Sequence, residues 1–584
     1  MRTPAPPPVA PRAAKAAGRS REYRGALYVP LDPNTYRLLD RYAIKYGPDS
    51  LQDPHTSVRP YTRAAAAHLG ERLLSGDSLA YSAGSLSRAD RFNAQYLLKD
   101  SWMYSALGDS LNVSRQPVLT YFYRDQTDLY HVQTKDFTFR LNPVLLLQGG
   151  KDGGSGSLDG LRYVNTRGIT LEGTIDQRLG FYAFLTDNQE AVPGWVQQRI
   201  VRDRVVPHEG YWKYFKTEGG SAYDFFTARG GITYAATKHI NVQLAHDRNF
   251  IGNGYRSLIL SDYSAPYFFL KFNTRIWKFN YQNLFAELTA RRGISDADTL
   301  YPKKYLALHH LSLDVTDNFN IGVFESEVSG GPGRGLELQY LNPVIFYRAI
   351  EQQVGSTDNA LLGIDFKWNI KHRAQLYGQL VLDEFKLSEV RAGNGWWANK
   401  QSVQLGGKYL DVAGVRNLDL QLELNYIRPY TYQHESPYTD YQHYRQPLAH
   451  PMGANLTEVV GIVSYQPLPR LNVVGKFFYT VQGLDFQAPA GASALTNYGG
   501  NVLLSYNTRP MEYGNRTGQG DKNRLLHADL TATYQPRLNL FVDATLIARH
   551  QSLDQPTYYG TVRGKEVYAS LAVRWNIAQR LHEL

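Results

Sequence analysis

The chain has 584 residues and contains 43 Tyr, 24 Phe and 50 Gly, but only 4 Met and no Cys. Tyr and Phe suit half-buried pleated surfaces, so this composition favours strands, and the lack of Cys excludes disulfides, thiolate metal sites and thiol nucleophiles. The net charge of +10 indicates an acidic partner, although a solvated basic surface explains it equally well. Because no dense Lys/Arg tract lies outside the N-terminal tail, we expect no nucleic acid as a partner.

Residues 1–26 are rich in Pro, Ala and Arg and show no core-forming pattern, so we expect a disordered tail. They contain no apolar run of the length that a signal peptide needs. We explain the missing signal peptide by a misassigned start or a trimmed chain. No apolar run in the chain approaches the roughly 18 to 20 residues of a transmembrane helix. That criterion does not apply to transmembrane strands, whose hydropathy averages out along the chain.

Residues 27–135 are predicted to form a small, mostly helical domain. Apolar residues recur there on single helical faces, and capping residues precede them. Helices are expected over residues 34–47, over 63–74 with Thr62 as the cap, and over 91–107 with Ser87 or Asp90 as the cap.

From about residue 136 to the C-terminus the apolar period changes from 3.6 to 2. In residues 418–426, for example, the even positions are Leu or Tyr and the odd positions are Asp, Gln, Glu and Asn. The segments 471–481, 538–546 and 567–577 alternate in the same way. Strict alternation is typical of a half-buried strand.

Short and long connections alternate between these strands, which number about 18 and have about 9 to 11 residues each, close to the length that a tilted membrane-spanning strand needs. This asymmetry predicts an all-β fold, a transmembrane antiparallel up-and-down β-barrel over residues 136–584, with short turns on the periplasmic side and long loops outside. A soluble propeller is the alternative, but no blade motif recurs at a fixed period. The long loops are expected at residues 187–224, 329–359, 428–455, 482–497, 507–524 and 550–564. Girdle aromatics are expected near strand ends at Tyr234, Tyr281, Tyr409, Tyr426, Tyr465, Tyr506, Tyr534 and Trp575.

Two pairs of residues could carry chemistry but are better explained as parts of the wall. His309 and His310 are adjacent on a strand and therefore face opposite sides, so we expect no shared metal ion and no cofactor. Glu325 and Glu327 share one face and could act as the acid–base pair of a glycosidase. Carboxylates at this spacing are ordinary on a polar inner face, so we predict a protein that is not an enzyme, and keep a hydrolase as an alternative.

Two loops, residues 393–400 and 427–447, contain residues suited to binding sugars. Aromatic faces stack on sugar rings, and Arg side chains bind carboxylates, so these loops suit an acidic polysaccharide. The alternative is a cap that packs only on itself. The predicted ligand-binding residues are Trp396, Trp397, Arg428, Tyr430, Tyr432, Tyr438 and Arg445.

The glycine-rich segment HDRNFIGNGYRSLILSDYSAPYFFLKF, residues 246–272, is not a dinucleotide-binding loop. Position 257 is Ser where a third glycine would be needed, and Pro266 with a strand-like FFLKF replaces the required helix. We predict an ordered segment at the outer end of the barrel or inside its lumen. Its structural residues are Asp247, Arg248, Gly252, Asn253, Gly254, Arg256 and Asp262, the charged ones forming a network that fixes the loop.

Four segments also carry a resemblance: YVPLDPNTYRLLDRYAIKYG, HTSVRPYTR, FIGNGYRSLILSDYSAPYFFLKF and LNPVIFYRAIE. The chain resembles the Bacteroidetes outer-membrane proteins known as gliding motility protein RemB, and is similar in turn to the Wzi capsule-assembly family. The resemblance implies an 18-stranded outer-membrane barrel with the small helical domain, residues 27–135, at its periplasmic end. It further implies a role in holding exported polysaccharide at the cell surface or in gliding.

The partners that the resemblance implies are outer-membrane lipid and lipopolysaccharide, surface polysaccharide, and other gliding or capsule-export proteins, with the chain itself a monomer. The alternative function is a pore for passive passage of solutes.

Overall fold

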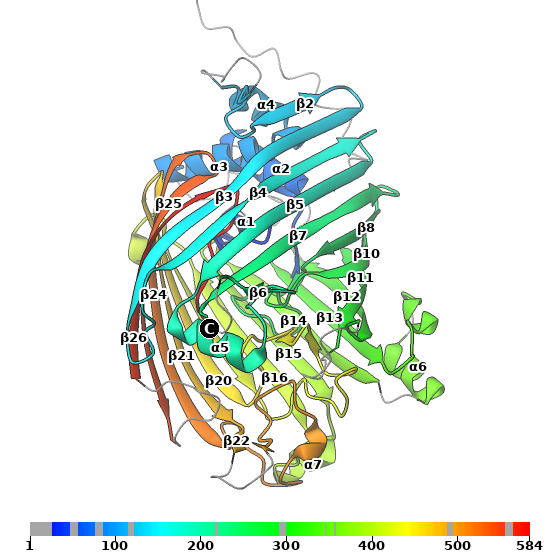
Figure 1. Ribbon diagram of the computed structural model, residues 1–584. Coiled ribbons are helices and arrows are strands. Elements are labelled where there is room, and N and C mark those ends of the chain that lie inside the picture. The colour runs from blue at the N-terminus through cyan, green and yellow to red at the C-terminus, as the bar shows by residue number, and fades with distance from the viewer. Residues whose placement is uncertain are drawn as a thin grey trace, which may run out of the picture.

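The protein is a closed antiparallel β-barrel with a group of helices at one end (Figure 1). The computed structural model describes residues 26–46, 57–75, 86–114, 122–216, 220–290, 300–344, 346–355, 358–487, 495–554 and 564–583. The predicted tail 1–26 therefore lies outside the described residues except for Ala26.

Eighteen strands among the described residues make the barrel, each pairing with its neighbours in chain order, and the last strand closes the barrel against the first. They are β3 (Phe137–Gly154), β4 (Arg162–Ile175), β5 (Leu179–Ala191), β7 (Ala222–Ala235), β8 (Ile240–Asp247), β10 (Tyr267–Ile276), β11 (Phe279–Thr289), β12 (Lys303–Thr316), β13 (Phe319–Gly330), β14 (Asn359–Ile370), β15 (Ala374–Glu384), β16 (Lys400–Tyr409), β17 (Leu418–Ile427), β20 (Leu456–Leu468), β21 (Leu471–Leu484), β24 (Asp521–Arg537), β25 (Leu540–Leu553) and β26 (Gly564–Trp575).

Short strands extend the wall or lie in the loops. They are β2 (Tyr130–Gln133) beside β3, β6 (Lys213–Tyr214) beside β7, and the pairs β1 (Val58–Arg59) with β9 (Phe250–Ile251), β18 (Gln442–His443) with β19 (Gln446–Pro447), and β22 (Phe486–Gln487) with β23 (Leu495–Thr496).

The predicted alternation is confirmed, and it sorts side chains between the lumen and the outer surface. On β17, Leu422 and Leu424 are 53% and 44% exposed, whereas Glu423 and Asn425 are buried in the lumen. An outward apolar band with a polar interior is the arrangement of a barrel that crosses a membrane. None of the described helices is long and apolar enough to cross a membrane.

The two ends of the barrel differ as predicted, with short turns at one end and long loops at the other (Figure 1). One expectation was wrong. The connection between β21 and β24 is a single long loop, residues 485–520, so the strand expected between residues 497 and 507 does not exist in the barrel. Tyr506 lies in a 3-10 turn of that loop instead of in a girdle, because its ring packs against loop aromatics at the far end from the short turns.

The helices are α1 (Pro33–Tyr46), α2 (Arg63–Ser75), α3 (Arg88–Asp100), α4 (Ala106–Asn112), α5 (Gly194–Asp203), α6 (Tyr347–Val354) and α7 (Leu387–Ala392). Ser87 caps α3 in a capping box with Asp90. The helix expected to run on to residue 107 ends at Asp100, because Ser105 accepts the N–H of Gly108 at 2.9 Å and begins α4.

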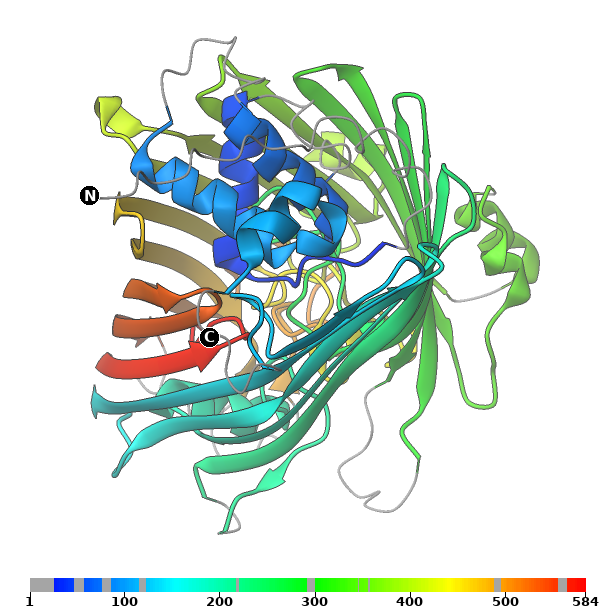
Figure 2. The same ribbon diagram turned by 90° about the horizontal axis from the view of Figure 1, so that it is seen from above.

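Helices α1 to α4 sit over the short-turn end of the barrel (Figure 2). They are held there by ion pairs that are largely shielded from water. Arg41 of α1 binds Asp419 of β17 and lies 2.6 Å from Asp411 in the β16–β17 turn. Arg63 of α2 binds Glu172 of β4 at 3.0 Å. Arginines of α1 and α2 thus join the small domain to the barrel.

Candidate functional site

The glycine-rich segment between β8 and β10 folds into the lumen. Ile251 pairs with Leu260 within the segment and with Val58 of β1, which follows the first helix. Leu258 and Ile259 are fully buried in the largest apolar core of the molecule. The segment therefore fills the middle of the barrel, one of the two placements that the sequence predicts.

A single wall carboxylate holds the glycine turn. Glu423 of β17 accepts the backbone N–H groups of Tyr255 at 2.7 Å and of Arg256 at 3.1 Å. A Cβ at Gly254 would collide with this carboxylate and would lie 2.8 Å from Oε1 of Gln404. Glycine is needed here because backbone and wall approach too closely for a side chain.

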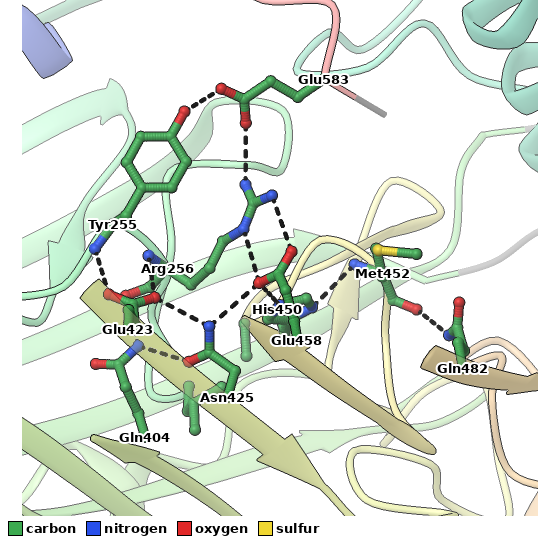
Figure 3. Close-up of polar contacts among 12 residues, drawn as sticks. Tyr255, Arg256, Gln404, Glu423, Asn425, His450, Met452, Glu458, Gln482 and Glu583 are labelled. Carbon is green, nitrogen blue, oxygen red and sulfur yellow. Dashed lines mark hydrogen bonds and ion pairs between the residues drawn. The ribbon is translucent and has the colours of Figure 1, made fainter. Parts of the chain in front are cut away.

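Arg256 lies at the centre of a buried charge network that joins three distant parts of the chain (Figure 3). Its guanidinium donates to Glu458 of β20 at 3.2 Å and to Glu583, near the C-terminus, at 3.2 Å. Glu458 also binds His450 at 2.9 Å, and Glu583 binds Lys476 at 2.7 Å and Tyr255. Burial alone would raise the pKa of Glu583, but Lys476 and Arg256 outweigh it and lower the pKa to about 2.

A cavity of about 270 Å³ lies beside this network, between the lumen segment and the inner face of β3 to β7. Charged residues from several elements line it, including Arg229, Arg248, Arg580 and Glu209. Burial, helped by Arg248 and Arg580, lowers the pKa of the lining residue His208 to about 3. Arg580 is already paired with Glu209 at 2.9 Å, so much of the lining charge is neutralised within the protein.

At the long-loop end, described parts of three loops pack together into a cap: residues 385–399, 428–455, and 485–487 with 495–520. Trp397 is its centre, with the rings of Tyr430 at 6.2 Å and Tyr506 at 4.8 Å between centroids. The Arg509 guanidinium lies 3.9 Å from the Trp397 ring centroid, and Lys386 lies 5.4 Å from that of Trp396. Trp396 is only partly buried, so part of its ring faces solvent. Lys386 pairs with Glu389 at 3.1 Å and Arg509 pairs with Glu512, so a carboxylate ligand would compete with these glutamates for the two basic groups.

The structure brings together only some of the predicted ligand-binding residues. Trp396, Trp397, Arg428 and Tyr430 share the cap cluster, where Arg428 donates to the Trp396 carbonyl at 3.3 Å. The remaining three lie elsewhere: Tyr432 is in the lumen core, Tyr438 is in the β17–β20 loop, and Arg445 donates to the Asp203 carbonyl of α5 at 2.6 Å.

The residues of the glycine segment also divide into two groups. Asp247 accepts from Tyr182 at 2.9 Å, and Arg248 donates to the Asp262 carbonyl at 3.2 Å. Asn253 is buried next to Asp40 of α1 in a small pocket. Arg256 instead binds β20 and the C-terminal residues.

Sequence reasoning missed the contribution of the last residues of the chain. Residues 576–583 return from β26 into the lumen, where Arg580 and His582 both bind Glu190 of β5. The signal available in the sequence is that apolar alternation stops at Ile577 and a charged stretch follows. It also missed Lys386 and Arg509, whose position beside the Trp pair depends on loop folding.

The two His residues face opposite sides, as predicted: His310 binds Asp365 in the lumen at 2.6 Å, and His309 binds Glu325 at 3.0 Å. The prediction that Glu325 and Glu327 line the inner face was wrong. They point outward and are covered by the β13–β14 loop, because the lumen side of β13 is occupied by an apolar core that includes Phe324. Within the described residues, no group of three His, Asp or Glu side chains could hold a metal ion.

Comparison with known proteins identifies the family. The model of the family described as capsule assembly protein Wzi matches residues 211–546, which is more than half of the chain. This chain belongs to the Wzi capsule-assembly family. No curated protein matches it.

Among solved structures, one similar to this Wzi-family chain is described as Wzi, an outer membrane protein involved in group 1 capsule assembly in Escherichia coli and a carbohydrate-binding β-barrel. It has 13% identity and a TM-score of 0.53, and the match covers 95% of this chain and 100% of that one. OprD from Pseudomonas aeruginosa has 10% identity and a TM-score of 0.40, over 75% of this chain and 94% of that one. OccAB4 from Acinetobacter baumannii has 10% identity and a TM-score of 0.40, over 76% and 98%. The first match shows that the Wzi fold is shared.

Proposed function

We propose that this barrel resides in the outer membrane and binds acidic surface polysaccharide with its long-loop cap, so that capsule is assembled or retained at the cell surface. The observation that carries the proposal is the cluster of Trp396, Trp397, Lys386 and Arg509 on a cap facing away from the helical domain. Aromatic faces and basic groups side by side suit sugar rings that carry carboxylates. Membership of the capsule-assembly family supports the same function.

An open pore is less well supported. Loops from both β8–β10 and β17–β20 contribute Leu258, Tyr432 and Tyr441 to one buried core inside the barrel, and α1 to α4 lie over the other end. A filled lumen favours an anchor over a passage for solutes. A role in gliding rests only on the resemblance carried by the segments 28–47, 55–63, 250–272 and 341–351.

Point substitution in the cap is the sharpest test. Removing residues 428–447 would also take Tyr432 and Tyr441 out of the lumen core, so a truncation confuses binding with folding. We expect Trp396→Ala to weaken binding of surface polysaccharide, extracted from the native cells, about tenfold, because one stacked ring contributes roughly 1 kcal/mol beyond its buried area. Binding is measured by isothermal titration calorimetry on the detergent-purified protein.

The matched control is Trp277→Ala. Trp277 is 75% exposed in the β10–β11 turn at the opposite end of the barrel, and its loss is expected to leave binding unchanged. Equal affinities for wild type and Trp396→Ala would reject the cap as the binding surface. A strain lacking the gene, scored for both capsule retention and spreading on agar, separates the capsule role from gliding.

A further inference from the structure

A segment of the β13–β14 connection lies outside the barrel wall instead of extending away from its end. It comprises residues 331–344 and 346–355, includes α6, and is called the arm below. Figures 1 and 2 show α6 on the outer side of the wall, beside β12 and β13. Tyr347 and Ile350 of the arm pack against Phe285 of β11 and Ala307 of β12.

The arm covers a polar patch on the outer face of the wall, formed by Glu325 and His309. Glu325 is paired in register with His309 of β12 on one side and Leu362 of β14 on the other. Leu362 is 42% exposed, and Val323, two residues before Glu325 on the same face, is 48% exposed. The carboxylate therefore lies beside outward apolar side chains, a setting in which an uncovered charge would be costly.

The arm satisfies this patch with its own backbone. The two oxygens of Glu325 accept the N–H groups of Tyr347 at 2.9 Å and Arg348 at 3.0 Å, which are unsatisfied donors in the first turn of α6. The His309 ring stacks on that of Tyr347 with centroids 4.2 Å apart. The arm is therefore docked by specific contacts on the lipid-facing side of the barrel.

The surface that the arm turns outward carries large apolar side chains, together with polar ones such as Gln339 and Asn342. Leu338, Val344 and Phe346 are 73%, 84% and 74% exposed. Large apolar side chains this exposed mark a contact surface, and here that surface continues the apolar band formed by Leu362 and Val323. Charged Arg348 pairs with Glu351 at 2.8 Å, so its charge has a partner within the arm.

We propose that the arm is embedded in the outer leaflet and binds the acyl chains of membrane lipid through Leu338, Val344 and Phe346, with Glu325 holding it against the wall. The barrel then contacts lipid through a wall-bound amphipathic segment as well as through its strands. Such a segment enlarges the lipid contact on one side of the barrel and leaves the cap clear for its own ligand.

Site-directed spin labelling tests this directly, because the native chain has no Cys. Single-Cys variants Val344→Cys and Phe346→Cys are labelled in phospholipid nanodiscs, and the ratio of accessibility to oxygen over a water-soluble nickel chelate is measured. The positive control is Leu571→Cys on the strand face, 67% exposed, and the aqueous control is Leu300→Cys in the β11–β12 loop, 96% exposed. We expect the ratio at both arm positions to equal that at Leu571 and to exceed that at Leu300.

A ratio like that of Leu300 would overturn the proposal, since the arm would then lie in water. Protection from both reagents would overturn it as well, because protein or a second copy of the chain would then cover the arm. Glu325→Leu, combined with the label at Phe346, is expected to make the label more mobile by undocking the arm. Glu287→Leu, a neighbouring outward glutamate paired with Lys303, is the control that leaves the label unchanged, and an immobile label in Glu325→Leu would reject the docking contact.

Discussion

Two regions that bury carboxylates, the network around Arg256 and the face of β13 under the arm, differ in how completely those carboxylates are hydrogen-bonded. In the lumen, both oxygens of Glu423, Glu458 and Glu583 accept hydrogen bonds from the glycine segment, the wall or Lys476. Under the arm, Glu325 is satisfied in the same way, but neither oxygen of the fully buried Glu327 has a partner among the described residues. Every carboxylate oxygen of the lumen network is hydrogen-bonded, as is usual in a structural core, whereas the arm leaves the Glu327 carboxylate without a hydrogen bond.

The largest expected effect comes from breaking the lumen network at Arg256. Arg256→Met leaves Glu458 buried without its arginine and removes one of the two cations that bind Glu583, so we expect the free energy of unfolding to fall by about 3 to 5 kcal/mol. The measurement is guanidinium unfolding in detergent, followed by tryptophan fluorescence. Arg524→Met is the control: its pair with Asp554 at 2.8 Å is exposed, and its loss should cost about 1 kcal/mol or less. Similar losses of unfolding free energy in the two variants would contradict the claim that the buried network around Arg256 stabilises the fold more than an exposed ion pair does.

A smaller effect is expected from acid, through Glu583. Its pKa is lowered to about 2 in the folded protein from the ordinary value of 4.5, so the stability it contributes is present above pH 4.5 and is lost as the pH falls toward 2. The shift corresponds to roughly 3 kcal/mol. Wild type is expected to lose that amount over this window, and Glu583→Gln to be less stable at pH 7 but flatter between pH 4.5 and 2. Parallel curves for the two proteins would show that this carboxylate does not contribute.

The parts of the structure that the sequence could predict are those set by local periodicity, and the parts that it could not predict depend on what fills the lumen. The barrel, its alternation and its turns were predictable because a period of two is a local property of each strand, as on β17. The faces of β13 were not, because Glu325 and Glu327 resemble lumen residues until one knows that Phe324 and the 248–266 segment fill the lumen with apolar side chains.

The candidate site was predictable to a similar degree. Trp396 and Trp397 could be selected as loop aromatics, since two adjacent indoles stand out in the loop GNGWWANK, residues 393–400. Their neighbours Arg509 and Tyr506 come from a loop more than a hundred residues away. Loop-to-loop packing of that kind has no periodic signal in the chain, and it also explains why Tyr506 was assigned to a girdle.

The smallest expected effect has the opposite sign and concerns Glu327. Glu327→Leu replaces a buried carboxylate that has no partner with an apolar side chain of similar length, so we expect the free energy of unfolding to rise by about 1 kcal/mol. Glu325→Leu, one pleat away on the same face, removes two backbone hydrogen bonds and the His309 contact, and is expected to destabilise the protein. Guanidinium unfolding of the two variants compares them directly. If Glu327→Leu is instead destabilising, then Glu327 has a stabilising partner in the folded protein, and the carboxylates of the two regions are equally well hydrogen-bonded. If Glu327→Leu is stabilising, the arm is held over β13 mainly by Glu325 and by the lipid in which the arm is proposed to lie.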